Sequence, residues 1–291
     1  MNSQFMLRFW CLVLTSAWLG NVWAVQLSPC QGHFGAVRGP AYSFSLVSPE
    51  KEIHPQQELE IARAARAIYD SWGDLLSAAP PFVVEVNVSL VSDPVQFNAM
   101  KQQLAPDLPD VTGFYSGANN QAVALYEPGD PGQSRRRALH EISHLITTTQ
   151  TGPAPYWLAE GLAEFYEMIE PRESGLAVVP NDRHLRWLAR NDAPPLADFF
   201  AVDADGWHRS DSQGHYSVAW SLVYFLMSSA EGRGALGQTL QQASTHSCGS
   251  YSAAAFLGQA WPGGIEDLEP RWRAWLAKGM FQPLSIGFAA T

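Results

Sequence analysis

One short motif, His140-Glu141-Ile142-Ser143-His144, limits what this chain can fold into more than any other part of it. Residues four apart lie on the same face of a helix, so His140 and His144 can offer two imidazole nitrogens to one metal ion. The carboxylate of Glu141 can then reach a water in an open position of that ion. A catalytic zinc site has three protein ligands and one open position. The motif therefore predicts a metal site that still needs a third ligand.

The third ligand is expected from a second helix, which the sequence predicts over residues 156–168. Pro155 stands just before it, where proline favours a helix start. Glu160 is the candidate ligand, because the chain after His144 is long enough to leave one helix, turn and begin another. Glu164 lies one turn further along, so we expect it to hold the ring of one ligand histidine. A surface ion pair is the alternative for Glu164.

A helix with two solvated histidines is the other interpretation of the motif. The residues around it argue against a surface helix, because apolar side chains recur on the remaining faces and indicate a buried helix. These side chains are Ala138, Leu139, Ile142, Leu145 and Ile146.

Together the two segments resemble the gluzincin branch of the zincin metallopeptidases. The order H-E-x-x-H and then W-L-x-E-G-L-A-E is most similar to the peptidase MA-like group. Residues 159–163 also resemble, more distantly, the N-E-G-F-A segment that carries the third ligand in some aminopeptidases. The similarity is strong over residues 137–168 and looser from about 112 to 280.

This resemblance implies an α+β fold of the thermolysin-like zincin type, with a small N-terminal sheet and a mainly helical C-terminal half. It implies one Zn²⁺ ion, held by His140, His144 and Glu160, and the hydrolysis of a peptide or protein substrate. Glu141 would act as general base, taking a proton from the attacking water and passing it to the leaving amine.

The oxyanion of the substrate needs a hydrogen-bond donor in addition to the metal. Tyr216, which opens a later helix, is similar in position to the tyrosine that serves the related aminopeptidases. His215 is the alternative donor, as in thermolysin-like enzymes. A structural tyrosine and a solvated histidine are the other interpretation.

The chain departs from the exopeptidases of the family in one segment. Those enzymes hold the free amine of the substrate with a glutamate in a G-x-M-E-N segment, whereas residues 117–121 contain no acid. This favours an endopeptidase or a specialised hydrolase. The competing function is a zincin-fold module that binds a peptide or partner with low activity. A structural zinc protein is disfavoured, because such sites have four protein ligands.

The first residues predict a secretory signal peptide over residues 1–24. Arg8 precedes an apolar stretch, residues 9–20, and residues 22–24 fit a cleavage site. That stretch is too short to span a bilayer, although an uncleaved anchor is the alternative. We therefore expect an exported, periplasmic or secreted protein with residues 25–291 as a single domain and no stable membrane span.

Removal of the signal would leave two cysteines, Cys30 and Cys248. In an exported protein such a pair favours a disulfide, with two buried thiols as the alternative. The formal net charge of −10 argues against nucleic acid and anionic membrane surfaces as partners.

Apolar periodicity predicts a strand-containing lobe, about residues 41–130, and a helical lobe, about residues 131–280. Helices are expected over residues 58–77, 94–104, 156–168, 182–190, 214–226, 231–244, 250–260 and 265–278, and the motif helix is expected to begin at about residue 134. Strands are expected over residues 82–91, 112–115 and 121–126, with a loop over 191–206.

Two local features carry further expectations. Residues 121–126 would form a sheet edge on which an extended peptide can pair, or an ordinary hairpin strand. Ser134 is the predicted N-cap of the motif helix. Arg135, Arg136 and Arg137 then oppose the helix dipole; Arg137 could bind Glu141 or a substrate carboxylate, or all three could form a solvated face.

Overall fold

The computed structural model describes residues 42–49, 53–108, 111–173, 175–209, 212–247 and 250–286. The predicted signal peptide, Cys30 and Cys248 lie outside these residues. The fold is α+β, as expected. Its strands are β1 (Tyr42–Val47), β2 (Val84–Val91), β3 (Gly113–Ser116), β4 (Gln121–Leu125), β5 (Ile169–Arg172), β6 (Gly175–Val178) and β7 (Leu284–Ile286).

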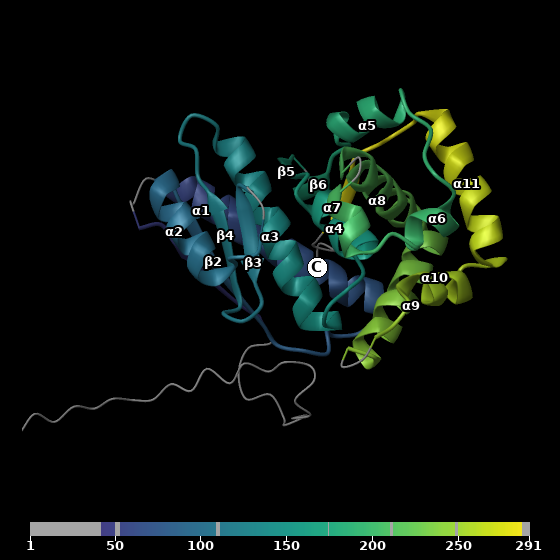
Figure 1. The fold of residues 1–291 in the computed structure, drawn as a ribbon, viewed down its shortest axis with the longest axis horizontal. Coiled ribbons are helices and arrows are strands. Elements are labelled where there is room, and N and C mark those ends of the chain that lie inside the picture. Colours follow the sequence, from purple (N-terminus) through teal and green to yellow (C-terminus); the bar gives the residue numbers. More distant parts are fainter. Residues whose placement is uncertain are drawn as a thin grey trace, which may run out of the picture.

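The helices occupy most of the C-terminal half (Figure 1). They are α1 (Pro55–Leu76), α2 (Pro94–Leu104), α3 (Pro131–Thr151), α4 (Tyr156–Tyr166), α5 (Asp182–Leu188), α6 (Leu196–Phe200), α7 (Ala204–Arg209), α8 (Ser212–Met227), α9 (Ala230–Thr245), α10 (Ala253–Ala260) and α11 (Gly264–Lys278). Most predicted helices are confirmed. The predicted loop over residues 191–206 is wrong, because it contains α6 and the start of α7.

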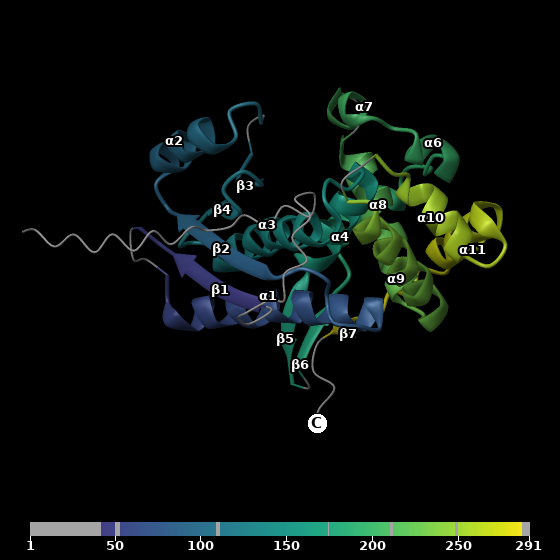
Figure 2. The same ribbon diagram turned by 90° about the horizontal axis from the view of Figure 1, so that it is seen from below.

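The larger sheet has the strand order β1-β2-β4-β3, with β3 antiparallel to β4 and the other pairs parallel. The outer strands β1 and β3 alternate in burial, whereas the central strand β4 is buried on both faces over Ala122, Val123 and Ala124. Ala122 and Ala124 of β4 belong to the main core with α1 and α3, whereas Val123 packs with Phe97 and Phe114 in a smaller cluster under α2. Helices therefore cover both faces of this sheet (Figure 2).

The edge of the sheet differs from the prediction. Strand β4, predicted to be the edge, lies between β2 and β3, so β3 is the edge strand at this side. The hairpin itself is confirmed, and Asn120 has the positive φ of 48° that its turn requires. Sequence spacing indicated the hairpin but not which of its strands pairs with β2.

Helix α3 begins one turn earlier than predicted. Its N-cap is Asp130, whose side chain accepts a hydrogen bond from the backbone N–H of Gln133, and Pro131 takes the first turn. Ser134 is therefore not the cap; its hydroxyl donates to the Asp130 carbonyl instead.

The three arginines of α3 form ion pairs with three different glutamates. The partners are Glu60 for Arg135, Glu170 for Arg136 and Glu127 for Arg137. These pairs support the interpretation of a partly solvated face. Arg137 contacts Glu127, at 2.7 Å, and not Glu141.

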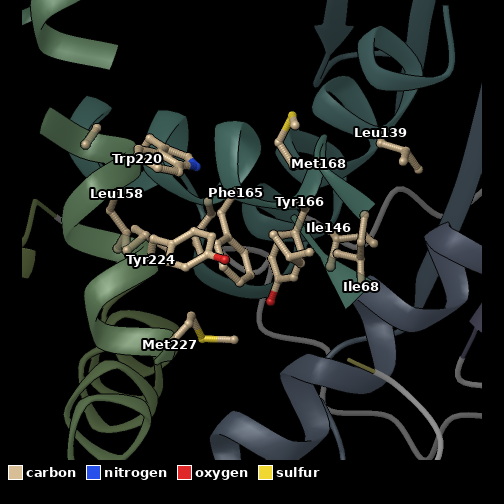
Figure 3. Close-up of a cluster of buried hydrophobic side chains, with 14 of the residues drawn as sticks. Ile68, Leu139, Ile146, Leu158, Phe165, Tyr166, Met168, Trp220, Tyr224 and Met227 are labelled. Carbon is tan, nitrogen blue, oxygen red and sulfur yellow. The ribbon is translucent and has the colours of Figure 1, made fainter. Parts of the chain in front are cut away.

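Helix α4 is buried between α8 on one side and α1 and α3 on the other. Figure 3 shows Phe165 beside Tyr224 of α8, and Tyr166 beside Ile68 and Ile146. The rings of Phe165 and Tyr224 lie 5.6 Å apart, and the Tyr166 hydroxyl bonds to Ser71 of α1 at 2.6 Å. The side chains of α4 thus join the two halves of the chain in one apolar core.

A second sheet lies in the C-terminal half, where the sequence predicted no strand. Its order is β5-β6-β7, and both pairs are antiparallel. Strand β5 contains Pro171, a residue that is rare inside strands, and each strand is too short to show alternation. Strand β7, the last described element of the chain, pairs with β6.

None of the helices in the described residues combines the length and the apolarity that a bilayer crossing requires.

Gly161 is required where α4 meets α8. A Cβ at this position would lie 2.8 Å from the Ala219 carbonyl oxygen and 2.8 Å from a methyl group of Val223. Since packed backbone cannot move freely, we expect Gly161→Ala to lower the free energy of unfolding by about 1–3 kcal/mol. Urea denaturation with a chelator present measures this change without a contribution from metal binding.

Gly234→Ala is the matched control, because Gly234 lies in α9 and a Cβ there would meet no neighbouring atom within 4 Å. In this exposed part of a helix, alanine loses less conformational entropy on folding than glycine does. The substitution should therefore raise the free energy of unfolding by roughly 0.5–1 kcal/mol. Equal effects at the two positions would contradict the close packing of α4 on α8.

Candidate metal centre

Three side chains from two crossing helices converge on one point. Helix α3 supplies His140 and His144, and α4 supplies Glu160. The Nε2 atoms of the two histidines lie 3.4 and 3.5 Å from the same Glu160 oxygen, Oε2. One ligand-type atom from each residue lies within 4.8 Å of the other two. The three residues that the sequence singled out are therefore brought together.

The spacing of these atoms fits a tetrahedral ion. Ligand atoms about 2.05 Å from zinc at tetrahedral angles lie roughly 3.4 Å from one another, which matches both measured distances. Oε2 of Glu160 is buried and makes no hydrogen bond within the described residues. An unsatisfied buried carboxylate oxygen is costly, so the donor set fits a cation shared with the two histidines.

The electrostatics of the site also favour a cation. Burial alone raises the pKa of Glu160, but His144 and His140 outweigh it and hold that pKa well below its ordinary value. Conversely, burial lowers the pKa of His140, and the Glu160 and Glu167 carboxylates raise it well above its ordinary value. Without an ion, this excess of negative charge is balanced by protons on imidazole; a metal ion can replace them.

The ligand side chains are not completely enclosed by the protein. The side chains of His140, His144 and Glu160 are 16%, 17% and 12% exposed. A fourth position can therefore be filled by water or substrate, as a catalytic site requires.

Glu141 lies beside the metal ligands on α3. Its carboxylate faces Gly113, the first residue of the edge strand β3. Burial raises the pKa of its carboxyl, while His140 and His144 lower it. A Cβ on Gly113 would lie 2.8 Å from Oε1 of Glu141. The absence of a side chain at Gly113 thus leaves room for this carboxylate against the sheet edge.

Glu164, predicted to hold a ligand histidine, makes its hydrogen bonds to α5, and one of its oxygens also lies within 4.8 Å of a ring nitrogen of His140. Its carboxylate accepts hydrogen bonds from Nε2 of His184, at 2.6 Å, and from Arg183, at 2.9 and 3.1 Å. These groups outweigh burial and lower its pKa. The contact to a ligand histidine is made by Glu167, whose Oε2 lies 3.1 Å from Nδ1 of His140.

Tyr216 and His215, the two predicted oxyanion donors, both pack against Trp207. Burial, and next the Glu160 carboxylate, raise the pKa of Tyr216 to about 12, so its phenol stays protonated at neutral pH. His215 stacks on Trp207, with ring centroids 5.0 Å apart, and its Nδ1 has no hydrogen-bond partner in the described residues. Of the two candidates, Tyr216 is therefore the one that the Glu160 carboxylate affects electrostatically.

Sequence reasoning missed Glu167 and Gly113. Glu167 follows Glu160 by seven residues, which is nearly two helical turns, so both lie on one face. That spacing could have identified it beside Glu164. Gly113 had no such signal, because its role depends on which strand forms the sheet edge.

A known family model matches part of the chain. Residues 136–248 match a family model described as "Protein of unknown function (DUF1570)". The matched segment includes most of α3 and all of α4, α5 and α8, and so every residue of the site except Gly113. No curated protein matches the chain.

The geometry predicts one metal ion for each chain. Purified protein should contain about one equivalent of zinc, and zinc should raise the melting temperature of the apo form, since a ligand that binds only the folded state stabilises it. His144→Ala and Glu160→Ala should each lose the bound metal. Elemental analysis and thermal melts measure both effects.

His246→Ala is the control, because His246 is exposed in the turn after α9. Its metal content should equal that of the wild type. Retention of a full equivalent by either ligand variant would contradict the assignment.

Proposed function

We propose that this chain is an exported zinc-dependent peptidase with a zincin-type catalytic domain. The observation that carries the proposal is the convergence of His140 and His144 on a buried, otherwise unsatisfied oxygen of Glu160. The buried carboxylate of Glu141 beside them is what favours hydrolysis. Two histidines and a carboxylate also suit iron(II) in oxygenases, but such a site has no evident use for an acid–base group at Glu141.

A zinc ion held by these residues would lower the pKa of a bound water towards about 7 and polarise a substrate carbonyl. Glu141 accepts the proton of the attacking water. The same group can then protonate the leaving amine. Its place next to Gly113 keeps both steps at the edge of the sheet.

Strand β3 offers the means to hold the substrate. Among the described strands it pairs only with β4, on one side. Its other edge can receive an extended peptide through backbone hydrogen bonds, which is β-augmentation. Because Gly113 lies against Glu141, a peptide bound there would pass beside the general base.

Tyr216 would donate a hydrogen bond to the oxyanion that develops on the substrate carbonyl. Its phenol is neutral at physiological pH, so the proton is available. The rings of Tyr216 and Trp207 lie 5.7 Å apart and nearly perpendicular, at 79°. Trp207 thereby limits the rotation of the tyrosine, and a preorganised donor stabilises charge more effectively than a mobile one.

A low-activity module that binds a peptide or partner is the competing function. It would use the same edge strand and metal site. The buried Glu141 argues against it, since burial of a carboxyl is costly and a site that only binds gains nothing from a general base.

Glu141→Gln separates these functions. The amide has nearly the shape of the carboxylate but cannot accept the proton, so we expect a 10²–10⁴-fold loss of peptide hydrolysis. Zinc content should remain at one equivalent, since Glu141 is not a ligand. Cleavage of a diverse peptide library, followed by mass spectrometry, measures the loss. Unchanged cleavage by this variant would contradict the role of Glu141 as general base. If the wild type cleaves no peptide, the binding module is favoured.

Tyr216→Phe tests the oxyanion donor. Loss of one donor should lower kcat by roughly 10²–10³-fold, with little change in KM or in zinc content. His215→Asn is the matched control on the adjacent residue and should change kcat far less. The opposite ranking would assign the donor to His215.

A further inference from the structure

The carboxylate of Glu167 bridges the metal site and the start of helix α5. It follows α4 directly, as its C-cap residue. One oxygen, Oε2, lies 3.1 Å from Nδ1 of His140. The other, Oε1, accepts a hydrogen bond from the side-chain amide of Asn181 at 3.3 Å. A carboxylate can only accept, so Nδ1 of His140 is the donor, and Nε2 is the ring nitrogen that can bind a metal once any proton on it is displaced.

Asn181 is held in a single orientation. It is 7% exposed and forms the N-cap of α5. Its side-chain oxygen accepts a hydrogen bond from the backbone N–H of Arg183 at 3.0 Å. Because the oxygen is used by the cap, the NH₂ group must point the other way, towards Glu167.

Helix α5, which carries Asn181, is itself fixed by a second contact to α4. His184 and Arg183 both bind Glu164, and the His184 ring stacks on Trp220 of α8 with centroids 5.2 Å apart. The cap therefore cannot shift relative to α4 without breaking buried hydrogen bonds. The two glutamates have separate tasks: Glu164 holds α5, and Glu167 contacts the ligand.

We propose that Asn181 is a positioning residue for the metal ligand His140, and that it acts through Glu167. The inference rests on the metal site of the proposed function but not on peptide hydrolysis. Groups that orient a ligand histidine from outside the metal's own shell affect metal affinity by about 10–100-fold. Asn181 is one group further out, and its influence has to pass through the Glu167 carboxylate.

The test is a double-mutant cycle at Asn181 and Glu167. The quantity measured is the affinity of each full-length variant for zinc. Asn181→Ser keeps a capping oxygen for α5 but removes the amide donor. We expect this variant to bind zinc roughly tenfold more weakly, and Glu167→Gln between about 10- and 100-fold more weakly. The double variant should bind about as weakly as Glu167→Gln alone, since Asn181 has no effect once Glu167 is changed.

Two further measurements distinguish positioning from a general loss of structure. Absorption spectra of the Co²⁺-loaded variants should shift relative to the wild type, because the orientation of a ligand has changed. Melting of each variant with a chelator present shows whether the apo fold is retained. Glu170→Gln is the matched control: Glu170 pairs with Arg136, one turn before His140 on α3, and its loss should leave zinc affinity unchanged.

Each other outcome would overturn the inference in a distinct way. If Asn181→Ser binds zinc as tightly as the wild type does, Asn181 does not position His140. Fully additive losses in the double variant would show that Asn181 acts through the fold and not through Glu167. A wild-type chain that binds no zinc would refute the metal site itself, whereas tight zinc binding without peptide cleavage would refute only the proposed peptidase.

Discussion

The crossing of α3 and α4 is the constraint on which the rest of the structure depends. The ligand side chains of these two helices are 12–17% exposed. The other sides of the helices are buried in apolar contacts with the sheet, α1 and α8. Burying apolar surface, at about 25 cal/mol for each Å², gives these helices the stability to hold polar groups that would otherwise repel one another. Gly161, next to the ligand Glu160, lets α4 approach α8 closely enough for this.

The acidic groups at the crossing explain why an ion is expected there. Four carboxylates, from Glu141, Glu160, Glu164 and Glu167, are partly or wholly buried around two helices. Glu164 is satisfied by Arg183 and His184, and Glu167 by His140 and Asn181. Oε2 of Glu160 has no hydrogen-bond partner among the described residues. Among the fully buried oxygens of these four carboxylates, it is thus the one that a cation can satisfy.

The sequence predicted the features that depend on helical spacing. The H-E-x-x-H motif placed two histidines on one face, and Glu160 stood at a distance that allowed a second helix to return it. It did not predict features set by tertiary contacts. Whether Glu164 or Glu167 meets His140 depends on how α4 is rotated and on where α5 packs. Which strand forms the sheet edge depends on the long-range pairing of β2 with β4, and no local pattern encodes that pairing.

The metal centre is tested most directly by X-ray absorption at the zinc edge on purified protein loaded with one equivalent of zinc. We predict a first shell of two imidazole nitrogens at about 2.0–2.1 Å together with oxygen ligands at about 2.0–2.2 Å, and loss of the imidazole signal in a His140→Ala, His144→Ala double variant. A first shell without imidazole, or one that is unchanged in that variant, would contradict a metal centre at the crossing of α3 and α4.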